Sequence, residues 1–204
     1  MMKLFDYQTD GVNWMICREN IEECKYPEDI EEYKSIKGGI LADEVGLGKT
    51  LQSIELITKN IKPNTLIIVP KSLLNQWKSE FEKFAHHVHV TFDEELYHNT
   101  DQNIIHVHIA SHSKMNAKNT DIENNVFTRI QWDRVIVDEA HVLKNHRSKI
   151  HKACANLQTD IKWALSATPV MNKMEDFINI IKWVGIPQNI CQNYTKDIVK
   201  YFTK

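Results

Sequence analysis

Residues 38–61 constrain the fold more than any other stretch, because three local patterns follow one another there. The segment GGILA (38–42) is aliphatic and of strand length, and DEVGLG (43–48) carries two glycines. From Lys49 onward the apolar residues repeat at helical spacing until Pro63 stops the run. A strand, a glycine-bearing turn and a helix in this order predict the arrangement that cradles a phosphate group.

The turn ends in Gly48, Lys49 and Thr50, as in the phosphate-binding motif GxxxxGK[ST], but Asp43 stands at the place of its first glycine. We expect the backbone at Gly46 and Gly48 to approach a phosphate closely. Lys49 would then reach the β- and γ-phosphates, and the Thr50 hydroxyl would ligate Mg²⁺. For this stretch alone, a glycine turn before a core helix remains the alternative.

Further apolar runs of strand length alternate with helical patterns along the chain. They are TLIIVP (65–70), RVIVDE (134–139), WALSAT (163–168) and IIHVHIA (104–110), in which histidines alternate with aliphatic residues. A helical repeat covers 72–84, where Ser72 is placed to cap the helix. This alternation predicts an α/β fold with a doubly wound, mostly parallel sheet flanked by helices.

The composition fits one large globular domain, with 204 residues, 42% hydrophobic and 25% charged. A net charge of -2 gives no broad basic field, so any nucleic acid would have to be bound by local patches. The four cysteines form no CxxC pair, which disfavours a zinc ribbon and favours reduced, unlinked thiols. Without an apolar signal region or a bilayer-length apolar run, we expect a soluble protein of the nucleus or cytoplasm.

An acidic pair, Asp138 and Glu139, follows the apolar run that begins at Arg134. The carboxyl end of such a strand is where α/β sheets place ligands. Asp138 there suits coordination of Mg²⁺, and Glu139 suits activation of the attacking water. An acidic pair that only interacts with a helix dipole is the alternative. The position about ninety residues after the phosphate loop favours the catalytic interpretation.

Several segments together resemble one known family. DEAH (138–141) resembles the Walker B box of superfamily-two helicases, and DEVGLGKT (43–50) resembles the DEMGLGKT loop of their Swi/Snf-type branch of ATP-driven DNA translocases. In that branch an Asp at the first-glycine position is normal, so Asp43 marks a variant loop. The segments 4–15, 69–84 and 165–177 resemble the Q-motif, motif Ia and motif III of the branch. The resemblance covers residues 4–184.

The resemblance implies a RecA-like lobe and assigns residues to its ATP site. Gln8 is implied to read the adenine, and His141 to hydrogen-bond Ser166 or Thr168 and so couple the ATP site to motif III. The implied nucleotide-binding residues of the loop are Asp43, Gly46, Leu47, Gly48, Lys49, Thr50 and Leu51.

The resemblance also implies contacts with nucleic acid. Lys71 and Ser72 of motif Ia are implied to touch its backbone, and Ser111 lies where motif Ib is expected, although ASHSK replaces the Thr-Tyr of the branch. Motif III reads SAT, which is common in other superfamily-two helicases and leaves DNA or RNA open. The second lobe of the family, which carries the arginine finger, is expected beyond Lys204.

We therefore expect the first lobe of a helicase or translocase that hydrolyses MgATP to move on duplex DNA, and little activity from this lobe alone. Its partners would be nucleic acid and a second RecA-like lobe. A single-lobe ATP- or nucleic-acid-binding module without turnover, or an RNA helicase lobe, remains the alternative. The histidines and tryptophans are not expected to form sites: His86, His87, His89, His106 and His108 at the surface, and Trp77, Trp132, Trp163 and Trp183 in the core.

Overall fold

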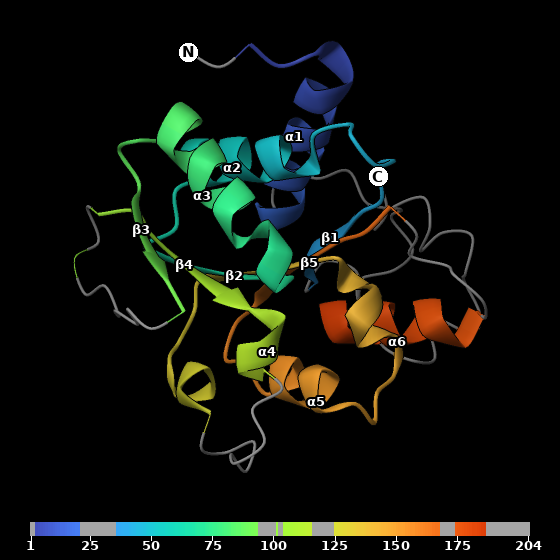
Figure 1. The fold of residues 1–204 in the computed structure, drawn as a ribbon. Coiled ribbons are helices and arrows are strands. Elements are labelled where there is room, and N and C mark those ends of the chain that lie inside the picture. Colours follow the sequence, from blue (N-terminus) through green and yellow to red (C-terminus); the bar gives the residue numbers. More distant parts are fainter. Residues whose placement is uncertain are drawn as a thin grey trace.

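A computed structural model describes residues 3–20, 36–93, 101, 104–115, 125–167 and 174–186 (Figure 1). These residues form a parallel six-stranded sheet in the order β1-β6-β5-β2-β4-β3. The strands are β1 (Lys37–Leu41), β2 (Asn64–Val69), β3 (His89–Phe92), β4 (His106–Ser111), β5 (Arg134–Asp138) and β6 (Ile161–Leu165). The predicted α/β fold with a parallel, helix-covered sheet is confirmed.

Helices cover both faces of the sheet (Figure 1). One face carries α1 (Asp6–Glu19), α2 (Lys49–Lys59) and α3 (Leu74–Phe84), and the other carries α4 (His112–Met115), α5 (Lys149–Ala155) and α6 (Met174–Val184). The short 3-10 helices are η3 (Lys71–Leu73), η5 (Val126–Arg129) and η6 (Ala140–Lys144). Each face packs its own apolar core against the strands, so the central strands are buried on both sides.

The alternating pattern of β4 does not mark an exposed face. His106 and His108 are fully buried, which corrects the expectation of surface histidines. Both rings contact the hydroxyl of Thr91 on β3, at 2.9 Å from His106 Nε2 and 2.8 Å from His108 Nδ1. A histidine can be buried when its ring nitrogen is hydrogen-bonded, and the neighbouring strand provides that partner here.

The start of α3 also differs from the prediction. The helix begins at Leu74, its N-cap is Leu73, and no side chain caps it. Ser72 lies in η3, which forms a tighter turn before the helix, and both Lys71 and Ser72 are exposed. The chain therefore leaves β2 through an exposed turn rather than entering a helix capped by Ser72.

A buried ion pair fixes the end of α1 to the sheet. Glu19 accepts hydrogen bonds from Arg134 of β5, with 2.6 Å between Arg134 Nε and Glu19 Oε1, and both side chains are fully buried. Asn60 Nδ2 donates to Glu19 at 2.6 Å and Trp163 Nε1 donates at 2.8 Å. The carboxylate is thus surrounded by donors from three different parts of the chain.

Cys17 on α1 forms a disulfide bond, which corrects the expectation of four unlinked thiols. Sequence spacing does not show which cysteines come within bonding distance in the fold. Cys154 on α5 is a free, buried thiol, and burial raises its pKa to about 12. Among the described residues, no helix combines the length and the apolar composition that crossing a bilayer requires.

Candidate nucleotide-binding site

The predicted site residues gather at the edge where the parallel strands end. Leu41 of β1 and Asp138 of β5 both pair with Leu165 of β6, so these strands end at the same level. The Ser166 N–H donates to the Leu41 carbonyl at 3.1 Å and joins the ends of β1 and β6. The phosphate loop follows β1 and Glu139 follows β5, so both start from the edge where α/β sheets bind ligands.

The loop between β1 and α2 has a backbone that suits a phosphate. Gly46 and Gly48 have φ angles of 86 and 83 degrees, a region that glycine adopts without steric cost. Immediately after Gly48, α2 begins, with no side-chain cap and no acidic residue in its first turn. An uncapped helix N-terminus presents N–H groups and a partial positive charge, which attract anions. The predicted strand, loop and helix are therefore in place.

Lys49 folds back over this loop. Its Nζ donates to the carbonyl oxygens of Asp43, at 2.6 Å, and Glu44, at 3.1 Å. Burial raises the pKa of Asp138, and the positive charge of Lys49 opposes this rise. Thr50 is next in the chain, half-buried in the first turn of α2.

Asp43, at the first-glycine position of the common motif, fastens the loop to α2. Its Oδ2 accepts a hydrogen bond from Gln52 Nε2 at 2.7 Å. Gln52 is fully buried, and its Oε1 has no hydrogen-bond partner within the described part of the chain. That oxygen faces Gly11 of α1, where an added Cβ would lie only 2.0 Å away. The role of Gln52 was not predicted, because its position in the helical repeat gives no sign of its partner.

Gln8 connects α1 to the same loop. Its Nε2 donates to the Leu47 carbonyl at 3.1 Å, and its Oε1 accepts from the Phe5 N–H at 3.0 Å. The amide lies so close to Gly48 that a Cβ there would be 2.4 Å from Nε2. Beside Gln8, the exposed rings of Phe5 and Tyr7 are stacked with centroids 5.9 Å apart. The structure places Gln8 at the loop, and its contact with adenine stays a prediction.

The Asp138 carboxylate accepts two hydrogen bonds. Trp77 Nε1 donates to its Oδ2 at 2.8 Å, and the Glu139 N–H donates to its Oδ1 at 2.9 Å. Burial raises the pKa of Asp138, while both hydrogen bonds act in the opposite direction. Trp77 is fully buried, as predicted, but its bond to Asp138 was missed. Apolar spacing locates a tryptophan in the core without showing where its N–H points.

Glu139 leaves β5 in a left-handed conformation, with a φ of 50 degrees, and is the only non-glycine residue with positive φ among the described residues. Such backbone strain in a residue that is neither Gly nor Asn is uncommon and occurs often at functional sites. Its Oε2 lies 3.1 Å from Nδ1 of His141. The predicted link of His141 to Ser166 or Thr168 stays a prediction, and Thr168 lies outside the described residues.

A second histidine contacts the same turn from the start of α4. His112 Nε2 lies 3.0 Å from the Asp138 carbonyl oxygen, and burial lowers the pKa of His112, which favours the neutral ring. A neutral ring can donate this hydrogen bond from Nε2. Asp138 is thus held by Trp77 at its side chain and by His112 at its backbone.

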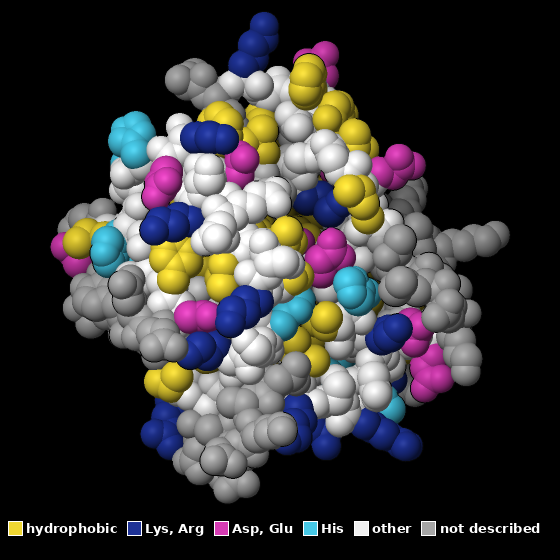
Figure 2. Space-filling view, viewed as in Figure 1, with side chains coloured by type: hydrophobic (Ala, Val, Ile, Leu, Met, Phe, Trp, Pro, Cys, Tyr) yellow, Lys and Arg dark blue, Asp and Glu magenta, His cyan; other side chains and the backbone are white. Residues whose placement is uncertain are grey.

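The predicted nucleic-acid residues have different environments. Lys71 and Ser72 are exposed directly after β2. Ser111 is fully buried, and its N–H and hydroxyl bond the Asp93 carboxylate at 2.6 and 3.0 Å. These bonds occupy Ser111 within the described fold, and its contact with nucleic acid stays a prediction. Figure 2 shows Lys and Arg side chains spread among acidic ones on this face, in keeping with the low net charge.

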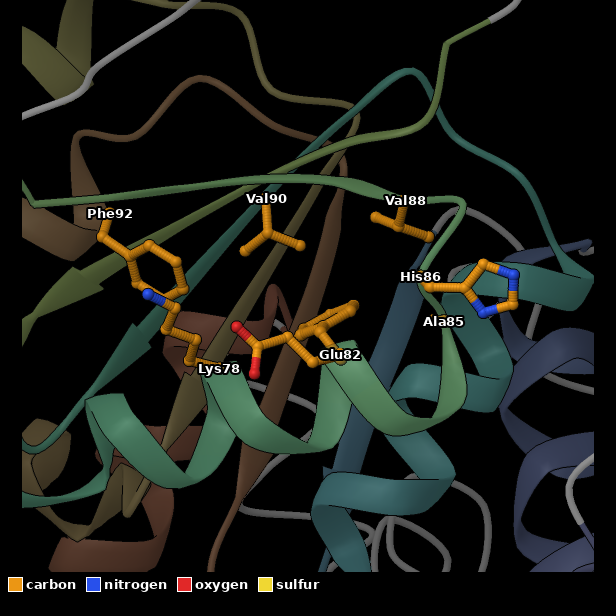
Figure 3. A pocket seen from close by; sticks show the side chains of 8 residues that line it. Lys78, Glu82, Ala85, His86, Val88, Val90 and Phe92 are labelled. Atoms are coloured by element: carbon orange, nitrogen blue, oxygen red, sulfur yellow. The ribbon is translucent and has the colours of Figure 1, made fainter.

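Two pockets lie away from the phosphate loop. Lys144, Asn145 and Glu175 line a polar pocket between η6 and α6. A second pocket lies between α3 and β3, where Lys78 Nζ is 5.5 Å from the centroid of the Phe92 ring (Figure 3). Its described lining includes none of the predicted nucleotide-binding residues, so neither the loop nor Asp138 opens into it.

The parallel sheet, the phosphate loop opening α2 and the acidic turn after β5 define a RecA-like α/β lobe. The profile of the SNF2-related domain matches residues 7–201. The chain therefore belongs to the SNF2-related domain family, in agreement with the resemblance found in its motifs.

Individual relatives support this assignment. The DNA repair protein RAD5 of Yarrowia lipolytica is 28% identical over an alignment of 241 residues, gaps included. The alignment covers 90% of this chain and 24% of that protein. An uncharacterized ATP-dependent helicase of Mycoplasma pneumoniae is 35% identical over 193 residues, which cover 89% of this chain and 17% of that protein. The chain thus spans about a quarter or less of the length of these relatives.

A solved structure shows the same fold. The SWI2/SNF2 ATPase core of Sulfolobus solfataricus in complex with dsDNA matches with a TM-score of 0.76 at 24% identity. The match covers 100% of this chain and 44% of that chain. At this identity the likeness establishes the RecA-like architecture.

Proposed function

We propose that this chain is the ATP-binding lobe of a nucleic-acid-dependent ATPase that hydrolyses MgATP to move on duplex DNA. The observation that carries the proposal is the convergence of Lys49 and Asp138 at one edge of the sheet. Lys49 opens α2 after the loop that follows β1, Asp138 ends β5, and both β1 and β5 end level with Leu165 of β6. A phosphate-binding lysine opposite a metal-binding carboxylate is the arrangement of P-loop ATPases.

The residues present fit Mg²⁺ and a nucleotide. The N-terminus of α2 has no side-chain cap, and the glycines of the loop allow a phosphate to approach its backbone. Burial raises the pKa of Asp138, and a cation beside the carboxylate would favour its charged form. Mg²⁺ is commonly bound through one or two protein oxygens together with substrate phosphates, so Thr50 and Asp138 are a sufficient protein contribution.

Each side chain then has a distinct task. Lys49 would exchange the carbonyl oxygens of Asp43 and Glu44 for phosphate oxygens, which carry more negative charge. Thr50 and Asp138 would hold the metal ion, which neutralises charge on the phosphates when bound. Glu139, held in its strained turn beside His141, would orient the attacking water and accept its proton.

The adenine would lie at the outer end of the loop, near Gln8. Gln8 already contacts the Leu47 carbonyl, so it would be able to sense both the base and the loop. The exposed rings of Phe5 and Tyr7 offer an apolar surface beside it. Leu51, half-buried in the first turn of α2, and Leu47 complete the predicted surroundings of the nucleotide.

We propose that the full-length protein moves along duplex DNA. The solved Sulfolobus solfataricus ATPase core is described in complex with dsDNA, and this chain exposes Lys71 and Ser72 at the same sheet edge as the proposed ATP site. Contacts with phosphate would carry charge without reading sequence. A second RecA-like lobe is the proposed partner within the full-length protein. Because an arginine finger is worth on the order of 10³–10⁵ in rate, the lobe alone should turn ATP over slowly.

ATP turnover of the full-length protein tests this proposal. The rate should rise when duplex DNA is added, and Glu139→Gln should abolish the stimulated rate. Stimulation by duplex RNA instead of DNA would favour an RNA helicase. Nucleotide binding without turnover under every condition would mean a binding module and would refute the proposed hydrolysis.

A further inference from the structure

The hydrogen bond between Trp77 and Asp138 joins two elements that are 61 residues apart in the chain. Trp77 lies in α3, six residues after the exposed Lys71, and its side chain is fully buried between α3 and the sheet. Its ring also packs on Phe81, with centroids 6.2 Å apart. Burial and packing on Phe81 therefore hold the indole in place independently of its bond to Asp138.

The bond fixes the carboxylate in one orientation. A buried indole N–H needs an acceptor, and a carboxylate is a strong one. Trp77 binds Oδ2 while the Glu139 N–H binds Oδ1, so rotation of the Asp138 side chain would break both bonds. Each carboxylate oxygen can accept more than one hydrogen bond or metal contact, so both keep capacity for a cation.

We propose that Trp77 is a positioning residue for Mg²⁺, which holds the Asp138 carboxylate ready for the metal ion through its indole N–H. The proposal rests on the proposed function, since it assigns Asp138 to Mg²⁺. Outer-shell groups that orient a metal ligand are typically worth about 10- to 100-fold in metal affinity. Trp77 would therefore act on the metal without touching it.

Trp77→Phe tests the proposal because it keeps an aromatic ring in the core and removes the N–H donor, together with some buried volume that the control below also loses. ATP binding is titrated by calorimetry with and without Mg²⁺, and the Mg²⁺ concentration for half-maximal enhancement of binding is recorded. We expect that concentration to rise about tenfold or more, while affinity for ATP without Mg²⁺ stays unchanged. In an Asp138→Asn background, Trp77→Phe should have no further effect on the Mg²⁺ dependence.

Trp132→Phe is the matched control. Trp132 is also fully buried and donates its indole N–H, in this case to the Phe127 carbonyl at 2.9 Å. Its removal should lower stability to a similar extent in urea denaturation but leave the Mg²⁺ dependence at the wild-type value. An equal change of the Mg²⁺ dependence in both variants would show a general loss of core packing and would overturn the role of Trp77.

The wild-type chain gives a readout that does not depend on a folded Trp77 variant. Addition of Mg²⁺ with ATP should shift the indole N–H resonance of Trp77. This Mg²⁺-dependent shift should vanish in Asp138→Asn. Mg²⁺-dependent ATP binding without any such shift, or with an unchanged Mg²⁺ dependence in Trp77→Phe, refutes the inference alone. Absence of ATP binding by the wild-type chain refutes the inference and the proposed function together.

Discussion

The buried pair of Glu19 and Arg134 should dominate the stability of this lobe. Glu19→Gln keeps the size of the side chain and removes its charge, leaving the Arg134 guanidinium buried without a counter-charge. Both side chains are fully buried, so water cannot replace the lost partner. Breaking a buried pair by removing one member typically costs about 3–5 kcal/mol. The magnitude is large because stabilities of single domains are only about 5–15 kcal/mol.

The surroundings of Glu19 support the upper part of this range. Besides Arg134, the side chains of Asn60 and Trp163 donate to the carboxylate, and an amide offers only one acceptor oxygen for them. At least one buried donor would then lose its partner. Unpaired buried donors add about 1–3 kcal/mol each.

Urea denaturation followed by circular dichroism measures the effect. Glu55→Gln is the control, because the Glu55–Lys59 pair is partly exposed and helical pairs of this kind contribute about 0.3–0.5 kcal/mol. Glu19→Gln should lower the free energy of unfolding several-fold more than Glu55→Gln. A loss below about 1 kcal/mol, similar to the control, would refute the assignment of a stabilising role to the buried pair.

Other perturbations follow from single contacts. Gly11→Ala should displace the Gln52 amide, which lies 2.0 Å from the new Cβ, and weaken ATP binding through the loop at Asp43; unchanged affinity in calorimetry would contradict this. Burial lowers the pKa of His108 from 6.5 to about 4. The free energy of unfolding should therefore fall by roughly 3 kcal/mol as the pH drops from 6.5 to about 4, and it should fall by less in His108→Gln. Equal pH dependence of unfolding in both proteins would exclude His108 as the cause. Lys71→Ala should reduce the salt slope of duplex DNA binding by about one, measured by fluorescence anisotropy, and an unchanged slope would remove Lys71 from the interface.

The sequence predicts the strand-helix order and the phosphate loop well, because both depend on local patterns. The apolar run at 134–138 and the loop at 43–48 lie where periodicity and glycine placement put them. Edge strand β3 (His89–Phe92) was missed because it is short and begins with an exposed histidine. Such a strand carries little hydrophobic signal of its own.

The sequence does not show which residues of different helices and strands contact one another. Gln52, Trp77 and Glu19 each occupy an ordinary position in a helical pattern, yet each contacts a residue on another element. The same reason applies to Ser111, whose motif position indicates a sheet edge but does not show its bond to Asp93. Polar contacts between distant segments depend on the packing of the whole sheet and its helices.

The central claim is that Lys49 binds the phosphates of ATP and that Glu139 acts only in hydrolysis. Calorimetric titration of MgATP into the wild-type chain, Lys49→Ala and Glu139→Gln tests this claim most directly. We expect Glu139→Gln to bind with wild-type affinity and Lys49→Ala to lose most of its binding, because the lysine charge acts on the bound phosphates while the glutamate acts on the water. Equal loss of binding in both variants, or no binding by the wild-type chain, would contradict the account.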